Sequence, residues 1–208
     1  MIRIIDYGLG NISAFLNVYK RLNIAATAAK TADELQGATK LILPGVGAFD
    51  HAMALLNRSG MRETVDDLVL RQRLPVLGIC VGMQILARTS EEGKAEGLGW
   101  IGGAVKGFRS LNRPDLILPH MGWNTLSERR THPLLADVPL GPDGLHAYFV
   151  HSYHLVADNP SHVLATVQYG QTVSAIVGRD NMIGTQFHPE KSQAVGLAFI
   201  RAFLAWSP

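Results

Sequence analysis

Up to residue 87, the chain alternates between short apolar runs and stretches with helical periodicity. The apolar runs have the length of buried strands and cover residues 1–6, 24–29, 40–43 and 76–79. Helical patterns follow at residues 12–22, 48–57 and 61–72, with a short helix expected to begin near Thr31. Because parallel strands need a crossover, usually a helix, this order predicts a mainly parallel sheet with helices on both faces.

The pattern changes after residue 87. Short apolar runs now alternate with turn residues, which favours antiparallel strands, at 100–105, 116–118, 147–150, 163–167, 174–177 and 182–187. A helix is expected over about 193–206, and the linker-like segment 139–144 is interpreted as a loop. We therefore expect a single α/β domain over residues 1–208: a mainly parallel central sheet flanked by helices, with additional antiparallel strands in the C-terminal half.

Composition excludes several classes of function. The net charge is +2 with no run of like charges, which argues against a nucleic-acid partner. No apolar stretch is long enough to span a bilayer, and Asp6 interrupts what would be the apolar part of a signal peptide. One cysteine excludes an internal disulfide. These features favour a cytoplasmic protein without a membrane partner.

The single cysteine lies in a distinctive setting, Gly78-Ile79-Cys80-Val81-Gly82, directly after a predicted strand. Glycines two residues to either side of a nucleophile predict a tight, strained turn that lifts its side chain out of the sheet. A helical stretch is expected to follow through Ala87, so that the sulfur faces a helix N-terminus that favours the thiolate. The alternative is a small buried hydrophobic side chain, and this motif alone leaves both interpretations open.

The third predicted strand runs into a glycine-rich loop, Pro44-Gly45-Val46-Gly47. Ligand sites in open parallel sheets gather at the carboxyl ends of the strands, where this loop and Cys80 should both lie. Such a loop can present backbone N–H groups, the donors that an oxyanion needs. An ordinary strand-to-helix turn is the alternative.

His188 and Glu190 follow the last apolar run. Pro189 biases His188 toward an extended conformation, in which residues two apart face the same side. A carboxylate there could orient the imidazole, as in a Cys-His-acid triad. His146, His151 and His154 have no spacing typical of a zinc site, and we expect them to serve packing or local hydrogen bonds.

The glycines at 8 and 10 suggest a dinucleotide site only weakly. A third glycine is needed where Ser13 stands, and no acidic residue ends the second strand near Ala29. A tight connection with Asn11 near a helix N-terminus is the better interpretation, and no cofactor is expected.

The loop, the cysteine turn and the Phe187-His188-Pro189-Glu190 stretch together resemble the triad-type glutamine amidotransferase family. Further motifs narrow the resemblance to the branch that serves imidazole glycerol phosphate synthase: Asp6-Tyr7-Gly8-Leu9-Gly10-Asn11, Ser90-Glu91-Glu92, Pro119-His120-Met121-Gly122-Trp123-Asn124, Tyr148-Phe149-Val150-His151-Ser152-Tyr153 and Lys191-Ser192-Gln193. Val81, where the family usually has leucine, is a mild departure.

This resemblance implies a triad-glutaminase fold and a role for each motif. The implied catalytic residues are Cys80, His188 and Glu190. The implied oxyanion donors are the backbone N–H of Val81 and one from Val46 or Gly47. Implied glutamine contacts are Gly47, Gln84, Glu92, Ser152 and Tyr153, with Glu91 as the alternative to Glu92. Gln84 stands four residues after Cys80 and so on the same helix face.

The resemblance also implies a partner. Ammonia released from glutamine would go to a (β/α)₈-barrel cyclase, forming a heterodimer that makes imidazole glycerol phosphate for histidine biosynthesis. Docking is expected near Asn11, Trp123 and Lys191. The alternatives are a glutaminase for another synthase, such as one making pyridoxal phosphate or amidating surface sugars, a non-catalytic regulatory subunit, and a cysteine peptidase or esterase.

Overall fold

The computed structural model describes residues 1–141, 144 and 146–208. An eight-stranded sheet formed by these residues has the order β2-β1-β3-β4-β13-β12-β11-β8. Its strands are β1 (Ile2–Ile5), β2 (Ala26–Ala29), β3 (Lys40–Gly45), β4 (Val76–Cys80), β8 (Ser127–Glu128), β11 (Val163–Tyr169), β12 (Gln171–Arg179) and β13 (Met182–Thr185). Pairings from β2 through β13 are parallel, and those among β13, β12, β11 and β8 are antiparallel. The predicted mainly parallel sheet with additional antiparallel strands in the C-terminal half is confirmed.

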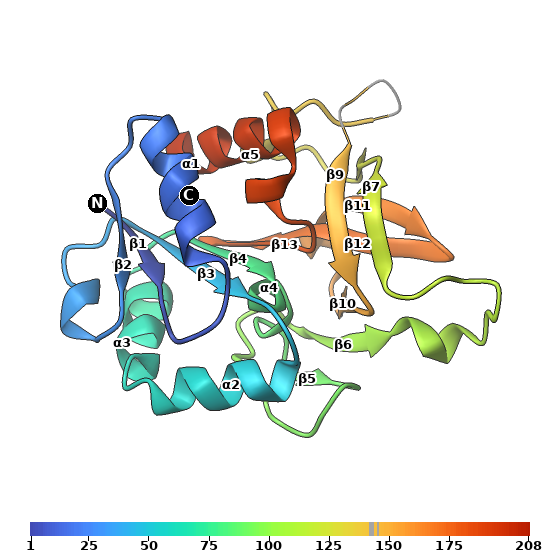
Figure 1. Cartoon of the computed structure of the whole chain (residues 1–208), viewed down its shortest axis with the longest axis horizontal. Helices are drawn as coiled ribbons and strands as arrows, with labels where there is room; N and C mark the ends of the chain where they lie inside the picture. Colours follow the sequence, from blue (N-terminus) through green and yellow to red (C-terminus); the bar gives the residue numbers. More distant parts are fainter. Residues whose placement is uncertain (142–143, 145) are drawn as a thin grey trace.

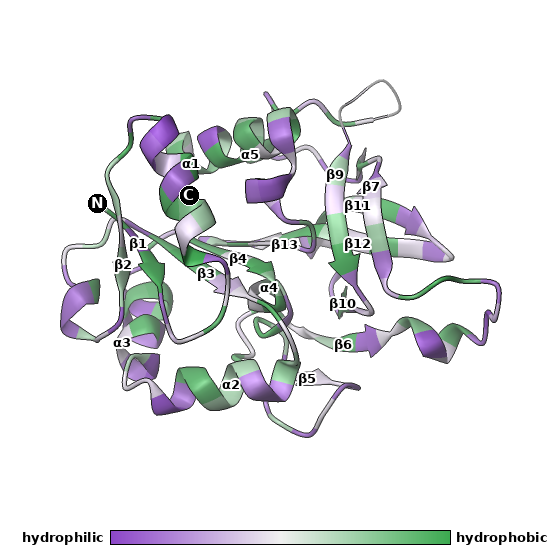
Figure 2. Cartoon of the chain, viewed as in Figure 1, coloured by the Kyte–Doolittle hydropathy of each residue, from purple (hydrophilic) through white to green (hydrophobic). Residues whose placement is uncertain are grey.

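Helices cover both faces of this sheet. They are α1 (Ile12–Arg21), α2 (Phe49–Arg58), α3 (Arg62–Asp66), α4 (Val81–Gln84) and α5 (Gln193–Ala205). Figure 1 shows α1 and α5 on one side of the sheet and α2 and α3 on the other. Apolar residues concentrate on the central strands and polar ones on the outer turns of the helices (Figure 2), so the main core lies between the layers.

Two smaller sheets stand beside the edge where β3 and β4 end (Figure 1). One has the order β10-β6-β5, with β5 (Thr89–Ser90), β6 (Gly103–Gly107) and β10 (Tyr153–Ala157). The other pairs β7 (His120–Asn124) with β9 (Ala147–His151) in an antiparallel ribbon. They extend the protein beyond the carboxyl ends of the parallel strands.

Several expected elements differ in the structure. Residues 116–118 form no strand, because Ile117 is 80% exposed and the run lies between prolines 114 and 119. The helix after Cys80 ends at Gln84, short of Ala87, and α3 continues as a π-helical turn over Asp67–Arg71. Of the predicted loop 139–144, Pro142 and Asp143 lie outside the described residues.

The glycine turn after β1 is a helix start. Gly8 and Gly10 have φ of 97° and 96°, and the Asn11 side chain caps α1 by accepting a hydrogen bond from the Ala14 N–H at 3.2 Å. The interpretation of a tight connection with Asn11 at the helix N-terminus is confirmed. None of the helices in the described residues is long and apolar enough to cross a membrane.

Candidate active site

Three neighbouring parallel strands end at one place. β4 lies between β3 and β13, with Gly45 opposite Cys80 on one side and Thr185 opposite Ile79 on the other. The loop after β3, the cysteine at the end of β4 and the residues after β13 therefore lie at the same edge of the sheet. This is the edge where open parallel sheets bind ligands.

Cys80 itself carries the strain of the turn. Its backbone has φ 55° and ψ −112°, a region that residues with a Cβ rarely adopt. Neither Gly78 nor Gly82 has a positive φ. Glycine is required at these positions because the neighbouring backbone leaves no room for a side chain. A Cβ on Gly82 would lie 1.9 Å from the Leu43 carbonyl oxygen, and one on Gly78 would lie 2.6 Å from that of Gly82. The strained turn is as predicted, but its glycines serve close packing.

The helix that follows Cys80 is a single turn, Val81–Gln84. So short a helix has a weak dipole, and the expected support of a thiolate by a helix N-terminus is correspondingly weak. Two side chains approach the sulfur instead: Gln186 Nε2 donates to Cys80 Sγ at 3.8 Å, and His188 lies close enough to be affected by its charge.

His188 and Glu190 meet through a turn. His188 is extended, as Pro189 predicts, but Pro189–Lys191 form a 3₁₀ turn, so the expected extended geometry stops at the histidine. This turn brings His188 Nδ1 within 2.8 Å of Glu190 Oε1, with both side chains buried. The contact is the predicted one, reached by a different backbone path.

The electrostatics of His188 follow from these neighbours. Burial alone lowers the pKa of the imidazole, but the Cys80 sulfur and the Glu190 carboxylate outweigh it and raise the pKa to about 9. His188 is therefore an imidazolium near neutral pH. Its Nε2 is buried and, among the described residues, has no aligned hydrogen-bond partner, so it is free to act on a bound molecule.

A pocket of about 390 Å³ opens over Cys80, a size suited to a small ligand. It is lined by Val46, Gly47, Cys80, Val81, Gln84, Glu92, Pro119, Val150, His151, Ser152, Tyr153, His188 and Lys191. All five expected glutamine contacts are among these residues, and so are the three expected sources of oxyanion donors. Glu190 stands behind His188, outside the lining.

The choice between adjacent glutamates follows from their contacts. Glu92 lines the pocket and accepts the Phe49 N–H, at the start of α2, at 2.8 Å. Glu91 instead binds Lys106 Nζ and the Gly107 N–H, both at 2.9 Å, and lines a different hollow. The structure therefore places Glu92, and not Glu91, in the pocket that Cys80 lines.

The loop between β3 and α2 is supported from behind. The buried Tyr7 hydroxyl donates to the Pro44 carbonyl at 2.7 Å, and burial raises the pKa of Tyr7. Gly10 lies so close that a Cβ there would be 2.7 Å from Pro44. Gly47 has φ 84°, a conformation that favours glycine, at the pocket wall.

The three expected interface residues occupy different places. Trp123 is 48% exposed, and its ring lies 5.7 Å from that of Tyr148. Lys191 lines the pocket with its Nζ 5.8 Å from the Tyr148 ring centroid, while Asn11 is exposed at the start of α1. Trp123, Tyr148 and Lys191 thus form a row from β7 to the pocket mouth.

Sequence reasoning missed Gln186 beside the sulfur and Pro119, Val150 and His151 in the pocket wall. A signal existed for Gln186, because it stands two residues before His188 and follows the strand next to Cys80. The interpretation that His146, His151 and His154 make local hydrogen bonds is confirmed: they contact Thr125, His120 and Gln171 respectively. Among the described residues, no three His, Cys, Asp or Glu side chains are grouped to hold a metal ion.

Comparison with known proteins identifies the family that this chain resembles. The family model for "Glutamine amidotransferase class-I" matches residues 3–205. The "Imidazole glycerol phosphate synthase subunit HisH" of Bdellovibrio bacteriovorus is 50% identical over 204 residues, covering 98% of both chains. The protein of the same name from Mesorhizobium japonicum is 49% identical over 215 residues, covering 100% of this chain and 99% of its own.

Solved structures share the fold at lower identity. A crystal structure of a glutamine amidotransferase superposes with a TM-score of 0.73 at 20% identity, covering 98% of this chain and 99% of the other. The glutaminase domain of Trypanosoma brucei CTPS, with bound acivicin, superposes with a TM-score of 0.63 at 14% identity and covers 100% and 94% of the two chains.

Proposed function

Because this chain belongs to the class-I glutamine amidotransferase family, we propose that it is the glutaminase subunit of an imidazole glycerol phosphate synthase. Glutamine is hydrolysed by Cys80, His188 and Glu190, and the ammonia passes to a cyclase partner. The observation that carries the proposal is a buried His188–Glu190 pair beside a cysteine on a strained turn, in a chain half identical to such subunits over its whole length.

The first half-reaction forms a thioester. The Cys80 thiolate attacks the side-chain amide carbon of glutamine, and the C–N bond breaks as His188 transfers its proton to the departing nitrogen, which leaves as ammonia. A histidine with a pKa of about 9 carries that proton at neutral pH. Glu190 accepts from Nδ1 and keeps Nε2 directed at the reacting atoms.

The second half-reaction releases glutamate. His188, now neutral, takes a proton from a water molecule while the water oxygen attacks the thioester carbon. The C–S bond then breaks and the thiolate is restored. Both steps pass through an oxyanion, for which the backbone N–H groups of Val81 and of Val46 or Gly47 are the donors at the pocket wall. Loss of one such donor typically lowers the rate by about 10²- to 10³-fold.

Acceptor groups in the pocket fit the rest of glutamine. The α-ammonium group of glutamine is positively charged and only donates hydrogen bonds. The Glu92 carboxylate in the pocket is a negatively charged acceptor for it. Both N–H bonds of Gln84 are used within the protein, so its Oε1 remains to accept from the substrate. Gly47, Ser152 and Tyr153 complete the substrate contacts.

A cyclase subunit with a (β/α)₈-barrel fold is the proposed partner, in a heterodimer that works in histidine biosynthesis. Ammonia is mostly protonated at neutral pH and diffuses away, so the acceptor site must be adjacent. Large apolar side chains are exposed near the pocket, with Met121 and Trp123 on one face of β7 and Val46 in the loop. We propose that this surface, together with Asn11 and Lys191, contacts the cyclase.

The test uses the complex with a candidate cyclase. Cys80→Ala should abolish imidazole glycerol phosphate formation from glutamine and leave the ammonia-dependent reaction at the wild-type rate, because only the glutaminase step needs the thiolate. The ammonia reaction is the internal control for folding and docking. Equal loss of both reactions would rule out this role for Cys80.

A further inference from the structure

The carbonyl oxygen of Tyr153 joins two series of hydrogen bonds. It accepts from Gln84 Nε2 at 2.9 Å and from His151 Nδ1 at 2.9 Å. One series continues from Gln84 Nε2 to Gln186 Oε1 at 3.1 Å, and from Gln186 Nε2 to Cys80 Sγ at 3.8 Å. The nucleophile therefore stands at the end of a chain that begins at a backbone carbonyl.

This chain determines which way each side-chain amide points. A carbonyl oxygen can only accept, so the Gln84 atom facing Tyr153 must be the nitrogen. That nitrogen also faces Gln186, so the Gln186 atom in contact must be the oxygen, and its nitrogen is turned to the sulfur. Only this arrangement satisfies all three contacts, and it places an N–H donor on Cys80.

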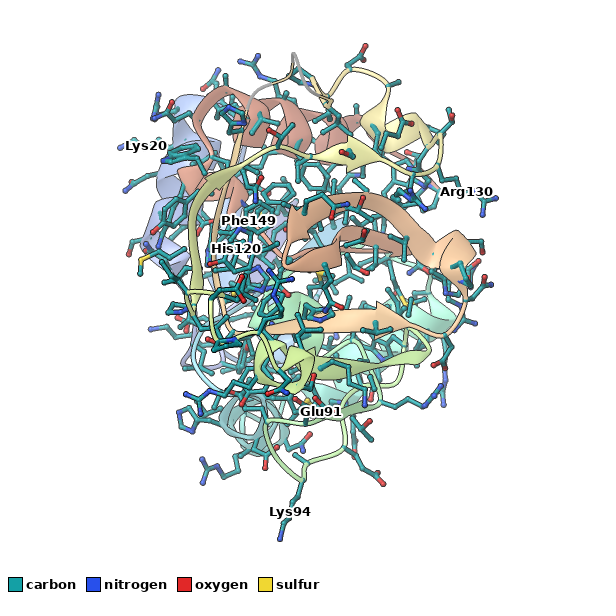
Figure 3. All side chains as sticks on the ribbon, turned by 90° about the vertical axis from the view of Figure 1, so that its right-hand side faces the viewer. Lys20, Glu91, Lys94, His120, Arg130 and Phe149 are labelled. Carbon is teal, nitrogen blue, oxygen red and sulfur yellow. The ribbon has the colours of Figure 1, made fainter. Side chains whose placement is uncertain are left out.

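The second series supports the same carbonyl from the other side. Because His151 Nδ1 donates to Tyr153, its Nε2 accepts from His120 Nδ1 at 2.9 Å, and His120 Nε2 accepts from Asn124 Nδ2 at 3.3 Å. His120 stacks on Phe149, with ring centroids 4.7 Å apart, and on Tyr169 at 3.9 Å. Figure 3 labels His120 and Phe149 next to each other. These contacts fix both imidazoles in the β7–β9 ribbon.

Burial keeps this pair uncharged. It lowers the pKa of His120 to about 4, and it lowers that of His151 to about 3 with further contributions from the neighbouring histidines. A neutral imidazole has one donor and one acceptor nitrogen, which is what the series requires of each ring.

Strand register brings Gln186 to the sulfur. In the parallel pairing of β4 with β13, Thr185 lies opposite Ile79, so the next residues along, Gln186 and Cys80, are level. Gln186 is fully buried and Gln84 nearly so, which makes a lost contact costly because water cannot replace it.

We propose that Gln186 is a positioning residue for Cys80: its amide, oriented by Gln84 and the Tyr153 carbonyl, donates to the sulfur and holds the thiolate toward the pocket. The inference rests on the proposed function only in making Cys80 the nucleophile. An N–H donor strengthens its hydrogen bond when the sulfur is charged, so the contact favours the reactive form.

The experiment measures the sulfur directly. Iodoacetamide labelling of Cys80, at fixed pH on the whole chain without glutamine, compares wild type with Gln186→Met, Gln84→Met and the double variant. Methionine keeps the length of glutamine and provides no donor. Thr185→Val is the matched control, because it removes a buried hydrogen bond to Phe187 from the same strand end.

Gln186→Met should lower the labelling rate by about tenfold or more, the usual effect of losing a hydrogen bond to a charged group. The kcat for glutamine should fall by a similar factor. Gln84→Met should also slow labelling, and the double variant should lie within about twofold of Gln186→Met, since the two amides act in series. Thr185→Val should lower the melting temperature without slowing labelling.

Wild-type labelling in Gln186→Met would overturn the proposal, as would equal slowing in Thr185→Val or simple additivity of the two glutamine variants. The outcome is separate from that of the proposed function. If the complex fails to use glutamine but labelling responds as described, the glutaminase assignment falls and the positioning of the sulfur by Gln186 stands.

Discussion

Ser192 shows how one hydroxyl can hold the proposed catalytic histidine, His188, in place from outside the pocket lining. It is fully buried, its Oγ donates to the His188 carbonyl at 2.6 Å, and it accepts the Tyr148 N–H at 2.9 Å. The His188 N–H in turn donates to the Tyr148 carbonyl at 3.0 Å. The backbone of the histidine is thereby fastened to β9.

Ser192→Ala should lower the kcat for glutamine by about tenfold with little change in KM, because His188 shifts while the pocket keeps its contacts. Stability should fall by about 1–3 kcal/mol, the cost of unpaired buried groups. Steady-state kinetics and denaturant unfolding measure the two effects. Unchanged kcat would contradict the positioning role.

The chain offers a matched control in Ser59. Its hydroxyl also donates to one carbonyl, that of Leu56 at 2.7 Å, and accepts one N–H, that of Met61 at 3.1 Å. Ser59 lies at the end of α2, outside the pocket lining. Ser59→Ala should cost stability and leave kcat unchanged.

At the residue scale, the sequence predicted the side chains whose chemistry has a characteristic spacing. The Gly-x-Cys-x-Gly motif and the His-Pro-Glu stretch identified Cys80, His188 and Glu190 as candidates. Gln186 and Ser192 stand beside the His-Pro-Glu stretch in the sequence, but the role of an amide or a hydroxyl follows only from the groups that face it in the fold. His151 illustrates the same limit, because its partner His120 lies on another strand.

The 3₁₀ turn Pro189–Lys191 depends on the helix that follows it. α5 approaches this turn so closely that a Cβ on Gly196 would lie 1.9 Å from the Pro189 carbonyl oxygen. Glycine is required here for space. The position of Glu190 behind His188 therefore rests on contact between two backbones.

Gly196→Ala should push the turn away from α5 and separate Glu190 from His188. We expect kcat to fall by more than tenfold and stability by about 1–3 kcal/mol, as in other overpacked sites. Ala194→Gly is the control, because it weakens the exposed first turn of α5 by about 1 kcal/mol without reaching Pro189. Similar kcat losses in both variants would show that helix stability alone matters.

Among the elements, those with strong periodicity were predictable and those made by contact were not. The apolar runs 40–43 and 76–79 became β3 and β4, and residues 12–22 became α1. β7 was not predicted, because Gly122, with φ 129°, interrupts the run of apolar residues that marks a strand. α4 ends at Gln84, although the helical pattern of the sequence continues through Ala87, because the chain turns there to join β5.

On the scale of the whole molecule, buried histidines divide into two groups with opposite shifts. The pKa of His188 is raised to about 9, whereas those of His120 and His151 are lowered to about 4 and 3, and burial lowers the pKa of His154 as well. A histidine in the unfolded chain titrates near 6.5. Folding therefore favours the protonated form of His188 and disfavours protonation of the other buried histidines.

These shifts predict greatest stability near pH 6.5. Above that pH the native chain holds a proton on His188 that the unfolded chain has lost, so stability falls between about 6.5 and 9, by up to about 1.4 kcal/mol per pH unit. As the pH falls below 6.5, His120 and His151 bind protons in the unfolded chain but not in the native chain, so stability falls again.

Urea unfolding at pH 5, 6.5 and 8.5 checks this dependence. His188→Gln should flatten the alkaline side and leave the acid side unchanged, which separates the two groups. A wild-type stability that continues to rise up to pH 8.5 would contradict the assignment.

The overall architecture was predictable because strand-helix alternation leaves few alternatives to a parallel sheet. The two small sheets were not, since their pairings join strands distant in sequence, such as β6 with β10 and β7 with β9. They carry Val150, His151, Ser152 and Tyr153 to the pocket, so this wall of the site depends on long-range pairing.

The strained backbone of Cys80 has a genetic consequence. At φ 55° and ψ −112°, glycine would be at ease where cysteine is not. A codon change to glycine would therefore remove the thiol while relaxing the fold, and quality control would have no reason to degrade the product. If the proposed cyclase partner is the right one, such an inert chain would persist, occupy that partner and withhold it from active copies, so the allele would act as a dominant inhibitor.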